Sequence, residues 1–143
     1  MAQATPHEVS VPVRWSDFDR YGHMMNANYI EIAQEARLAF ARDVIYPEIP
    51  DFDVFVRHID ADFQRPVDPR KNSALTVRSA VSKLGNTSLT TRQDILDADG
   101  KTACVIYTVQ VMVDMQAQRP RPLSDAEREI LSQLVVDEQW SDA

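Results

Sequence analysis

Two carboxylates, an imidazole and two carboxamides crowd into one short segment near the N-terminus of the chain. Asp17 and Asp19 precede His23, and Asn26 and Asn28 follow it closely. A carboxylate can attack a carbonyl carbon or activate the water that attacks it, and free amides at a helix N-terminus stabilise the negative charge that develops on the carbonyl oxygen. The segment therefore holds the groups that hydrolysis of an acyl compound needs, provided that a helix starts within it.

Other interpretations of this segment stay open. A calcium-binding loop would also begin Asp17-x-Asp19, but its fifth position is Tyr21. Its twelfth position is Asn28 instead of glutamate. A metal site that included His23 would lack a cysteine or a second histidine nearby, so we expect neither metal nor cofactor. Aspartate and asparagine also cap helices, and a single histidine also stabilises turns, so a purely structural role is the main alternative.

Patterns of apolar residues predict the elements on either side of this segment. Alternation predicts a half-buried strand over Val9–Trp15, and Pro12, which has no N–H to donate, favours a sheet edge or a strand end. Helical periodicity predicts an enclosed helix from Asn28 to about Val44. Because this helix follows the segment directly, its N-terminal amides would lie beside the carboxylates and the histidine. The residues of its main apolar face are Tyr29, Ile32, Ala33, Ala36 and Phe40.

Four more strands are predicted after the helix, with no second helix between them. Apolar residues favour odd positions over 55–63, 75–81 and 89–95, whereas Ala103–Val113 is apolar on both phases, as in a central strand covered on both faces. Ser124 and Glu127 fit a capping box that opens a C-terminal helix over about 124–140. The order predicts one α+β domain over residues 1–143, in which an antiparallel five-stranded sheet wraps around one long central helix.

Composition narrows the class of protein. The chain has 143 residues, 44% of them hydrophobic and 26% charged, which is typical of one globular domain. It contains no apolar run of the roughly 20 residues that cross a membrane and no recognisable signal peptide, so we expect a cytoplasmic protein. Its single cysteine, Cys104, is expected to be a buried hydrophobic residue. The net charge of −7 argues against nucleic acid as a partner.

The segment from Asp17 to Tyr29 resembles the signature of the 4-hydroxybenzoyl-CoA thioesterase-like branch of the hotdog-fold acyl-CoA thioesterases. That signature is approximately Asp-x-Asp-x-x-Gly-His-Val-Asn-Asn-x-x-Tyr. Met24 and Met25 depart from it, and one carboxamide of the usual pair is therefore missing. Later stretches of the chain are similar to the family in the same order, so the resemblance covers roughly residues 7–135. The matching positions are Asp17, Asp19, Gly22, His23, Asn26 and Tyr29.

The resemblance implies a hotdog fold and hydrolysis of an acyl-CoA to CoA and a carboxylic acid. Asp19 matches the catalytic carboxylate, which acts as nucleophile or general base. Asn26 matches the residue whose backbone N–H faces the thioester carbonyl, and His23 matches an imidazole that positions water or substrate. Asp17 is expected to bond the backbone of the turn. A non-catalytic thioester-binding module and an enoyl-thioester hydratase or dehydratase are the alternative functions.

The resemblance also implies where coenzyme A binds and how chains assemble. Arg119 and Arg121 resemble the phosphate-contacting arginines of the family, whereas Ser88 and Arg65 are weaker candidates for binding the substrate. A single sheet around one helix leaves strand edges and one sheet face uncovered. The family pairs two sheets edge to edge, so we predict a homodimer or a dimer-of-dimers tetramer with a site shared between chains. The acyl group is not specified by the sequence, because pocket depth depends on packing between subunits.

Overall fold

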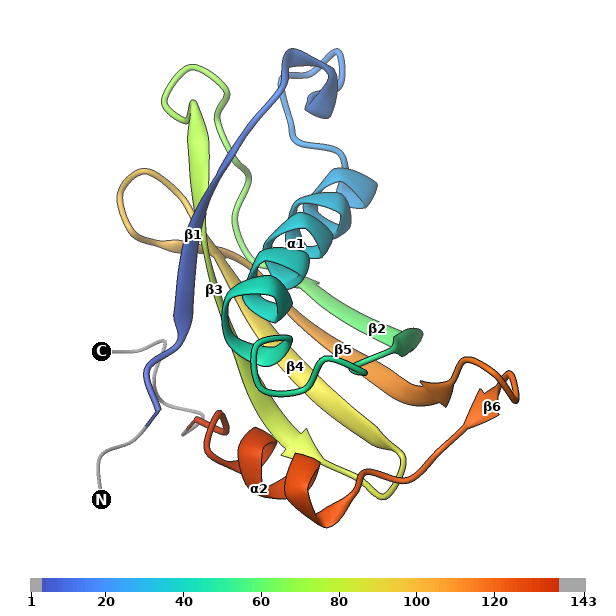
Figure 1. Cartoon of the computed structure of the whole chain (residues 1–143). Helices are drawn as coiled ribbons and strands as arrows, with labels where there is room; N and C mark the ends of the chain where they lie inside the picture. The colour runs from blue at the N-terminus through green and yellow to red at the C-terminus, as the bar shows by residue number, and fades with distance from the viewer. Residues whose placement is uncertain (1–3, 137–143) are drawn as a thin grey trace.

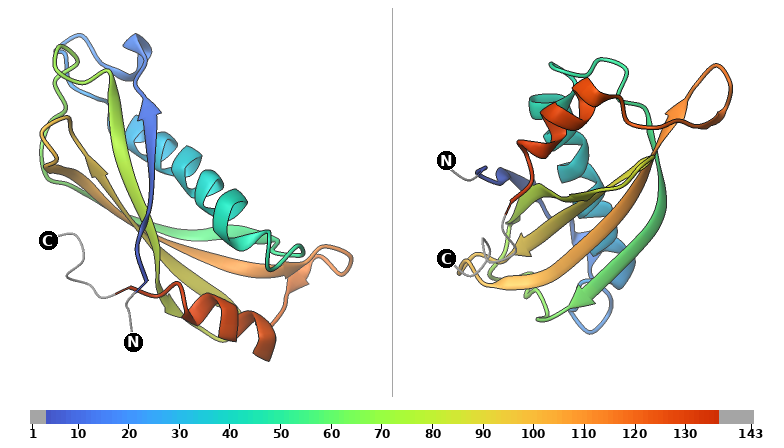
Figure 2. Two further views of the ribbon diagram at one scale, coloured as in Figure 1. Left: turned by 60° about the vertical axis from the view of Figure 1, so that its left-hand side comes forward. Right: turned by 90° about the horizontal axis from the view of Figure 1, so that it is seen from below.

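A curled antiparallel sheet wraps around one long helix in the structure, a computed structural model that describes residues 4–136 (Figure 1). The helix α1 (Asn26–Phe40) lies in the concave side of the sheet, and the short helix α2 (Asp125–Ser132) packs against β3 (Figure 2). This arrangement confirms the predicted α+β fold. The strands are ordered β1 (His7–Pro12), β3 (Ala74–Leu84), β4 (Ser88–Leu96), β5 (Thr102–Asp114) and β2 (Val54–Phe63), and β6 (Arg119–Pro120) pairs with β5.

The first strand is shorter than its alternation predicts. β1 lies at a sheet edge and ends at Pro12, in agreement with the missing N–H of this residue. Trp15 does not continue the strand but begins a single 3₁₀ turn (Trp15–Asp17), and it is 90% exposed. The turn forms because the backbone amide of Asp17 donates to the carbonyl of Arg14, at 2.9 Å.

The helix α1 buries the predicted face but is not enclosed all round. It begins at Asn26, two residues earlier than expected, and continues as a π-helical turn over Ala41–Ile45. Its opposite face is open in the single chain, where Glu31 and Glu35 are exposed and Leu38 is 60% exposed. The expectation of an enclosed helix therefore fails within one chain, because the sheet covers only one side of α1. The buried residues include Tyr29, Ile32, Ala33, Ala36 and Phe40.

The strand β2 forms the other sheet edge and contains a β-bulge at Arg57. Phe55 pairs with Val111 and Ile59 pairs with Thr108. Since positions 108 and 111 are an odd number of residues apart, Phe55 and Ile59 point to opposite faces of the sheet. The prediction that the odd positions over 55–63 share one face is therefore wrong at Phe55, because the extra residue of the bulge reverses the phase.

The strand β5 is covered on one face only. Cys104, Ile106 and Met112 are buried against the concave side, as predicted for one phase. On the other phase, residues in the middle of the strand such as Val105 and Tyr107 are only partly buried on the convex face, and burial is complete only at the ends of the run, at Ala103 and Val113. The expectation that Ala103–Val113 is covered on both faces is therefore wrong for a single chain, because no layer of the described residues packs over the convex face of β5.

The predicted C-terminal helix is present, but within the described residues it is shorter than predicted. The capping box is confirmed, since the backbone amide of Glu127 donates to the Ser124 hydroxyl at 3.1 Å and the Glu127 carboxylate accepts from the Ser124 amide at 2.8 Å. The helix α2 ends at Ser132, whereas positions 137–140 of the predicted helix lie outside the described residues. Within residues 4–136 no helix has the length and apolar character needed to cross a membrane.

A band of buried polar residues divides the core under α1 into two apolar clusters. On each of the three central strands, polar side chains of the concave face lie between an apolar residue of one cluster and an apolar residue of the other. On β4, for example, Ile95 belongs to the first cluster and Leu89 to the second. The band, hereafter the polar band, consists of Ser79, Thr91, Gln93, Thr108 and Gln110.

Candidate active site

Asp17 fastens the β1–α1 loop (residues 13–25) to the start of α1. Its buried carboxylate accepts hydrogen bonds from the backbone amide of Arg14 at 2.7 Å, from the Arg14 guanidinium at 2.9 Å and from the Asn28 side-chain amide at 2.8 Å. Burial by itself would raise the pKa of Asp17, but the hydrogen bonds from Arg14 and Asn28 outweigh it and hold this pKa below its ordinary value. The structural role expected of Asp17 is therefore confirmed.

We expect Asp17→Asn to destabilise the protein by about 2–4 kcal/mol, because one of the new amide donors would face the donors of Arg14 or Asn28 in a buried place. The folded pKa of Asp17 lies below its unfolded value, so its contribution is present at neutral pH and is lost as the pH falls through the folded pKa. Urea unfolding between pH 7 and pH 3 measures both effects. Equal stability of variant and wild type at pH 7 would contradict this role.

Asp19 lies at the exposed tip of the same loop. Its Oδ1 atom accepts hydrogen bonds from the backbone amides of Tyr21 at 2.9 Å and His23 at 3.1 Å, and its carbonyl accepts from the Gly22 amide at 3.0 Å. Gly22 has a φ of +76°, which glycine adopts without strain. The Oδ2 atom of Asp19 forms no hydrogen bond with residues 4–136, so one carboxylate oxygen is free for chemistry.

The helix α1 begins without a capping side chain. Its N-cap residue is Met25, which forms no side-chain cap, and the Asn28 amide donates to the Met25 carbonyl at 2.9 Å. The amides of Asn26 and Ala27 have no acceptor within the described part of the chain. These donors sit at the positive end of the helix dipole, where a carbonyl oxygen that gains negative charge is stabilised.

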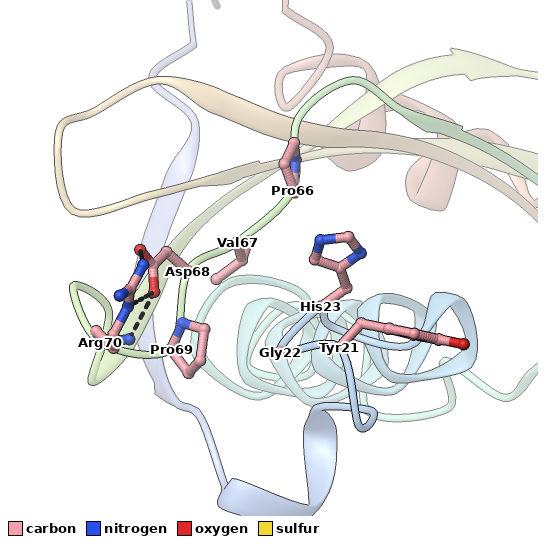
Figure 3. A pocket seen from close by; sticks show the side chains of 8 residues that line it. All are labelled: Tyr21, Gly22, His23, Pro66, Val67, Asp68, Pro69 and Arg70. Carbon is pink, nitrogen blue, oxygen red and sulfur yellow. Dashed lines mark hydrogen bonds and ion pairs between the residues drawn. The ribbon is translucent and has the colours of Figure 1, made fainter.

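Two cavities that share His23 and Pro66 lie beside the loop. The larger, of about 530 Å³, lies between Tyr21–His23 and Pro66–Arg70 (Figure 3). In this view the Arg70 guanidinium is turned to Asp68, with which it forms an ion pair at 3.1 Å. The smaller cavity, of about 210 Å³, reaches the start of α1. It is lined by His23, Met24, Asn26, Tyr29, Phe63, Gln64, Arg65 and Pro66.

The aromatic wall of the smaller cavity was not predicted. The rings of Tyr29 and Phe63 lie 5.4 Å apart between centroids, and Phe63 is 42% exposed at the end of β2. The apolar pattern places Tyr29 on the buried face of the helix, but no pattern in the sequence indicates that its ring meets Phe63. Cys104 is buried, so its prediction as a buried hydrophobic residue is confirmed, and this burial raises the pKa of its thiol to about 12.

The predicted site residues form two groups at opposite ends of β2. Asp19, His23, Asn26 and Arg65 lie at the end where β2 finishes. The second group lies where β2 begins, since Ser88 pairs with Val111 of β5, and Val111 pairs on its other side with Phe55, the second residue of β2. The two ends of this strand of ten residues are about 30 Å apart. One chain therefore does not bring the groups together. The second group consists of Ser88, Arg119 and Arg121.

The two arginines of the second group differ in whether their guanidinium group already forms an ion pair. Arg121 is bound on both terminal nitrogens by the Glu127 carboxylate, at 2.8 Å each, and lowers the pKa of Glu127 to about 2. Arg119 is exposed and forms no ion pair with the described residues. It lines a groove of about 290 Å³ together with Phe55, Arg57 and other residues. Arg119 is therefore the better placed of the two for meeting a phosphate.

Comparison with known proteins agrees with this geometry. The chain matches the model of the thioesterase-like superfamily over residues 13–134. It is similar to a thioesterase from Thermus thermophilus solved with coenzyme A and Zn (26% identity, 93% of this chain and 97% of that chain covered, TM-score 0.77). It also has the fold of a thioesterase superfamily structure from Jannaschia sp. CCS1 (21% identity, 96% and 100% covered, TM-score 0.78).

No curated protein matches the chain. The solved structures nevertheless cover it almost completely, which confirms the predicted hotdog fold. The family model extends from the β1–α1 loop through both cavities to the end of α2, so it includes every residue of the candidate site. We conclude that this protein belongs to the thioesterase-like superfamily.

Proposed function

We propose that the protein hydrolyses acyl-CoA thioesters to coenzyme A and a carboxylic acid. The observation that carries this proposal is the uncapped N-terminus of α1, which lines a cavity beside a loop with a free carboxylate oxygen. The coenzyme A bound to the similar Thermus thioesterase supports the class of substrate. Asp19 would act in one of two ways, as nucleophile or as general base.

The chemistry follows from the positions of three groups. The thioester carbonyl would accept hydrogen bonds from the Asn26 or Ala27 amide, which stabilise the oxyanion. The Oδ2 atom of Asp19 would either attack the carbonyl carbon or remove a proton from the attacking water, while His23 positions that water. The C–S bond then breaks and the thiolate of coenzyme A leaves. When Asp19 attacks directly, water hydrolyses the resulting anhydride in a second step.

We propose further that the working unit is a homodimer paired along β2, or a tetramer made of two such dimers. The outer edge of this strand, on the side away from β5, pairs with no other strand of residues 4–136, and the strand exposes apolar side chains at Phe55, Val56, Ile59 and Phe63. Antiparallel pairing of β2 with its copy around a two-fold axis would place the beginning of one β2 beside the end of the other. The two groups of site residues would then meet across the interface.

A panel of acyl-CoA thioesters with a thiol reagent tests the proposed reaction. We expect release of free thiol from at least one acyl class. Binding of acyl-CoA with no thiol release would instead support the non-catalytic module. Hydration of an enoyl-CoA without thiol release would support the hydratase or dehydratase.

Charge reversal at the second group should weaken binding more than chemistry. We expect Arg119→Glu to raise KM roughly tenfold with little change in kcat, since phosphate contacts are the same in ground and transition states. Arg121→Glu should raise KM as well, and should also destabilise α2 because Glu127 loses its partner. Added salt should imitate the first variant by screening. Arg42→Glu, on the exposed π-helical turn, is the control, and an unchanged KM in Arg119→Glu would exclude that residue.

A further inference from the structure

A third cavity lies between α1 and β2, at the end of α1 away from Asn26. It has a volume of about 330 Å³. Its lining includes the polar residues Gln34 and Arg37 from α1 and Gln110 from β5, together with Tyr46 and apolar residues such as Leu38 and Val56. Both this cavity and the smaller cavity at Asn26 are lined by residues of α1 and β2, but they lie at opposite ends of these two elements.

Arg37 is a cation with no anionic partner among residues 4–136. Its side chain is half-buried and forms no hydrogen bond or ion pair within residues 4–136. Burial lowers its pKa below the ordinary value, and no acidic group in the described part of the chain offsets this loss of water. A planar guanidinium in such surroundings binds a carboxylate through two parallel hydrogen bonds, and the low local polarity strengthens them.

The polar band leads to the same cavity. Gln110 lines it and donates from Nε2 to the Thr91 hydroxyl at 3.4 Å. Further along the band, the Oε1 atom of Gln93 and the hydroxyl of Thr108 are buried and have no partner within the described residues. Of the polar band, only Gln110 lines the cavity itself. A pocket for a plain hydrocarbon chain gains nothing from a polar lining, because burying unpaired polar atoms costs free energy.

We propose that this cavity binds a carboxylate carried by the acyl group, remote from the thioester, so that the preferred substrates are carboxyacyl-CoA thioesters. The inference rests on the proposed function. Antiparallel pairing along β2 would place the Arg37 cavity of one protomer beside the Asn26 cavity of its partner, because they are lined by opposite ends of the strand. The thioester would react at one protomer while the distal carboxylate meets Arg37 of the other.

The test compares ω-carboxyacyl-CoA thioesters with unsubstituted acyl-CoA thioesters of equal chain length, in the wild type and in Arg37→Met. For the best chain length we expect wild-type kcat/KM to favour the carboxyacyl substrate at least tenfold. Arg37→Met should remove this preference, mainly through a higher KM, and should change hydrolysis of the unsubstituted substrate less than twofold. Arg42→Met, five residues further along the chain on an exposed turn, should retain the wild-type preference.

The outcomes separate this inference from the proposed function. If the wild type hydrolyses unsubstituted thioesters with no preference for carboxyacyl groups, this result overturns the inference but not the proposed hydrolase function. It needs only the wild type, so it decides the question even when Arg37→Met does not fold. Equal losses on both substrates would also overturn it. If Arg37→Met instead lowered the mass in light scattering, Arg37 would bind a carboxylate of the second copy, which overturns the substrate assignment. No hydrolysis of any thioester would defeat the proposed function itself.

Discussion

Asp19→Asn should lower kcat by at least two orders of magnitude while leaving the protein folded. General-base catalysis contributes about 10²–10⁴-fold, and asparagine can act neither as base nor as nucleophile. Folding should survive because the asparagine Oδ1 atom can still accept from the backbone amides of Tyr21 and His23. Single-turnover thiol release, together with thermal unfolding, measures the two properties separately.

Asp17→Asn is the matched control for this experiment, since it makes the same chemical change two residues earlier in the loop. The Asp17 carboxylate is buried and fully engaged by Arg14 and Asn28, so this variant should lose stability rather than intrinsic turnover at low temperature. Normal turnover in Asp19→Asn with none in folded Asp17→Asn would reverse the assignment of the two carboxylates.

Ile59→Asp should convert an oligomer into a species near the chain mass of 16.3 kDa and lower kcat/KM more than tenfold. Ile59 is 37% exposed near the middle of β2, so the two-fold pairing would bring two added carboxylates close together in an apolar interface. Activity should fall because each site needs residues from the start of the other copy's β2. Light scattering at micromolar concentration and the thiol-release assay measure both effects.

Ser10→Asp provides the control, because Ser10 is an exposed residue of β1 at the opposite sheet edge. This variant should keep the wild-type mass and activity. A wild-type protein that is fully active near 16.3 kDa would refute the shared site, and Ile59→Asp would then have no effect on mass.

The elements that could be predicted are those whose residues carry a local pattern. The odd-phase strands 75–81 and 89–95, the apolar face of α1 and the capping box at Ser124 each depend on a short stretch of chain, and the structure has them. The predictions fail where a single residue changes the phase or the length of a strand, or where burial depends on whether another layer covers the element. The bulge at Arg57 reverses the phase at Phe55, and the turn held by Asp17 removes Trp15 from its strand.

The sequence by itself determined the fold class, because the order of the elements follows from local apolar periodicity along the chain. It also placed the start of a helix beside Asp19 and His23, and the signature that the loop resembles implied the structural role of Asp17. Only the tertiary structure decided which distant residues meet. It separated Ser88, Arg119 and Arg121 from the helix N-terminus by the length of β2 and left Arg37 without an ion pair among the described residues that line its cavity. Local periodicity cannot contain such facts, because they depend on strand order and on how α1 crosses the sheet, which bring residues far apart in the chain to the same place.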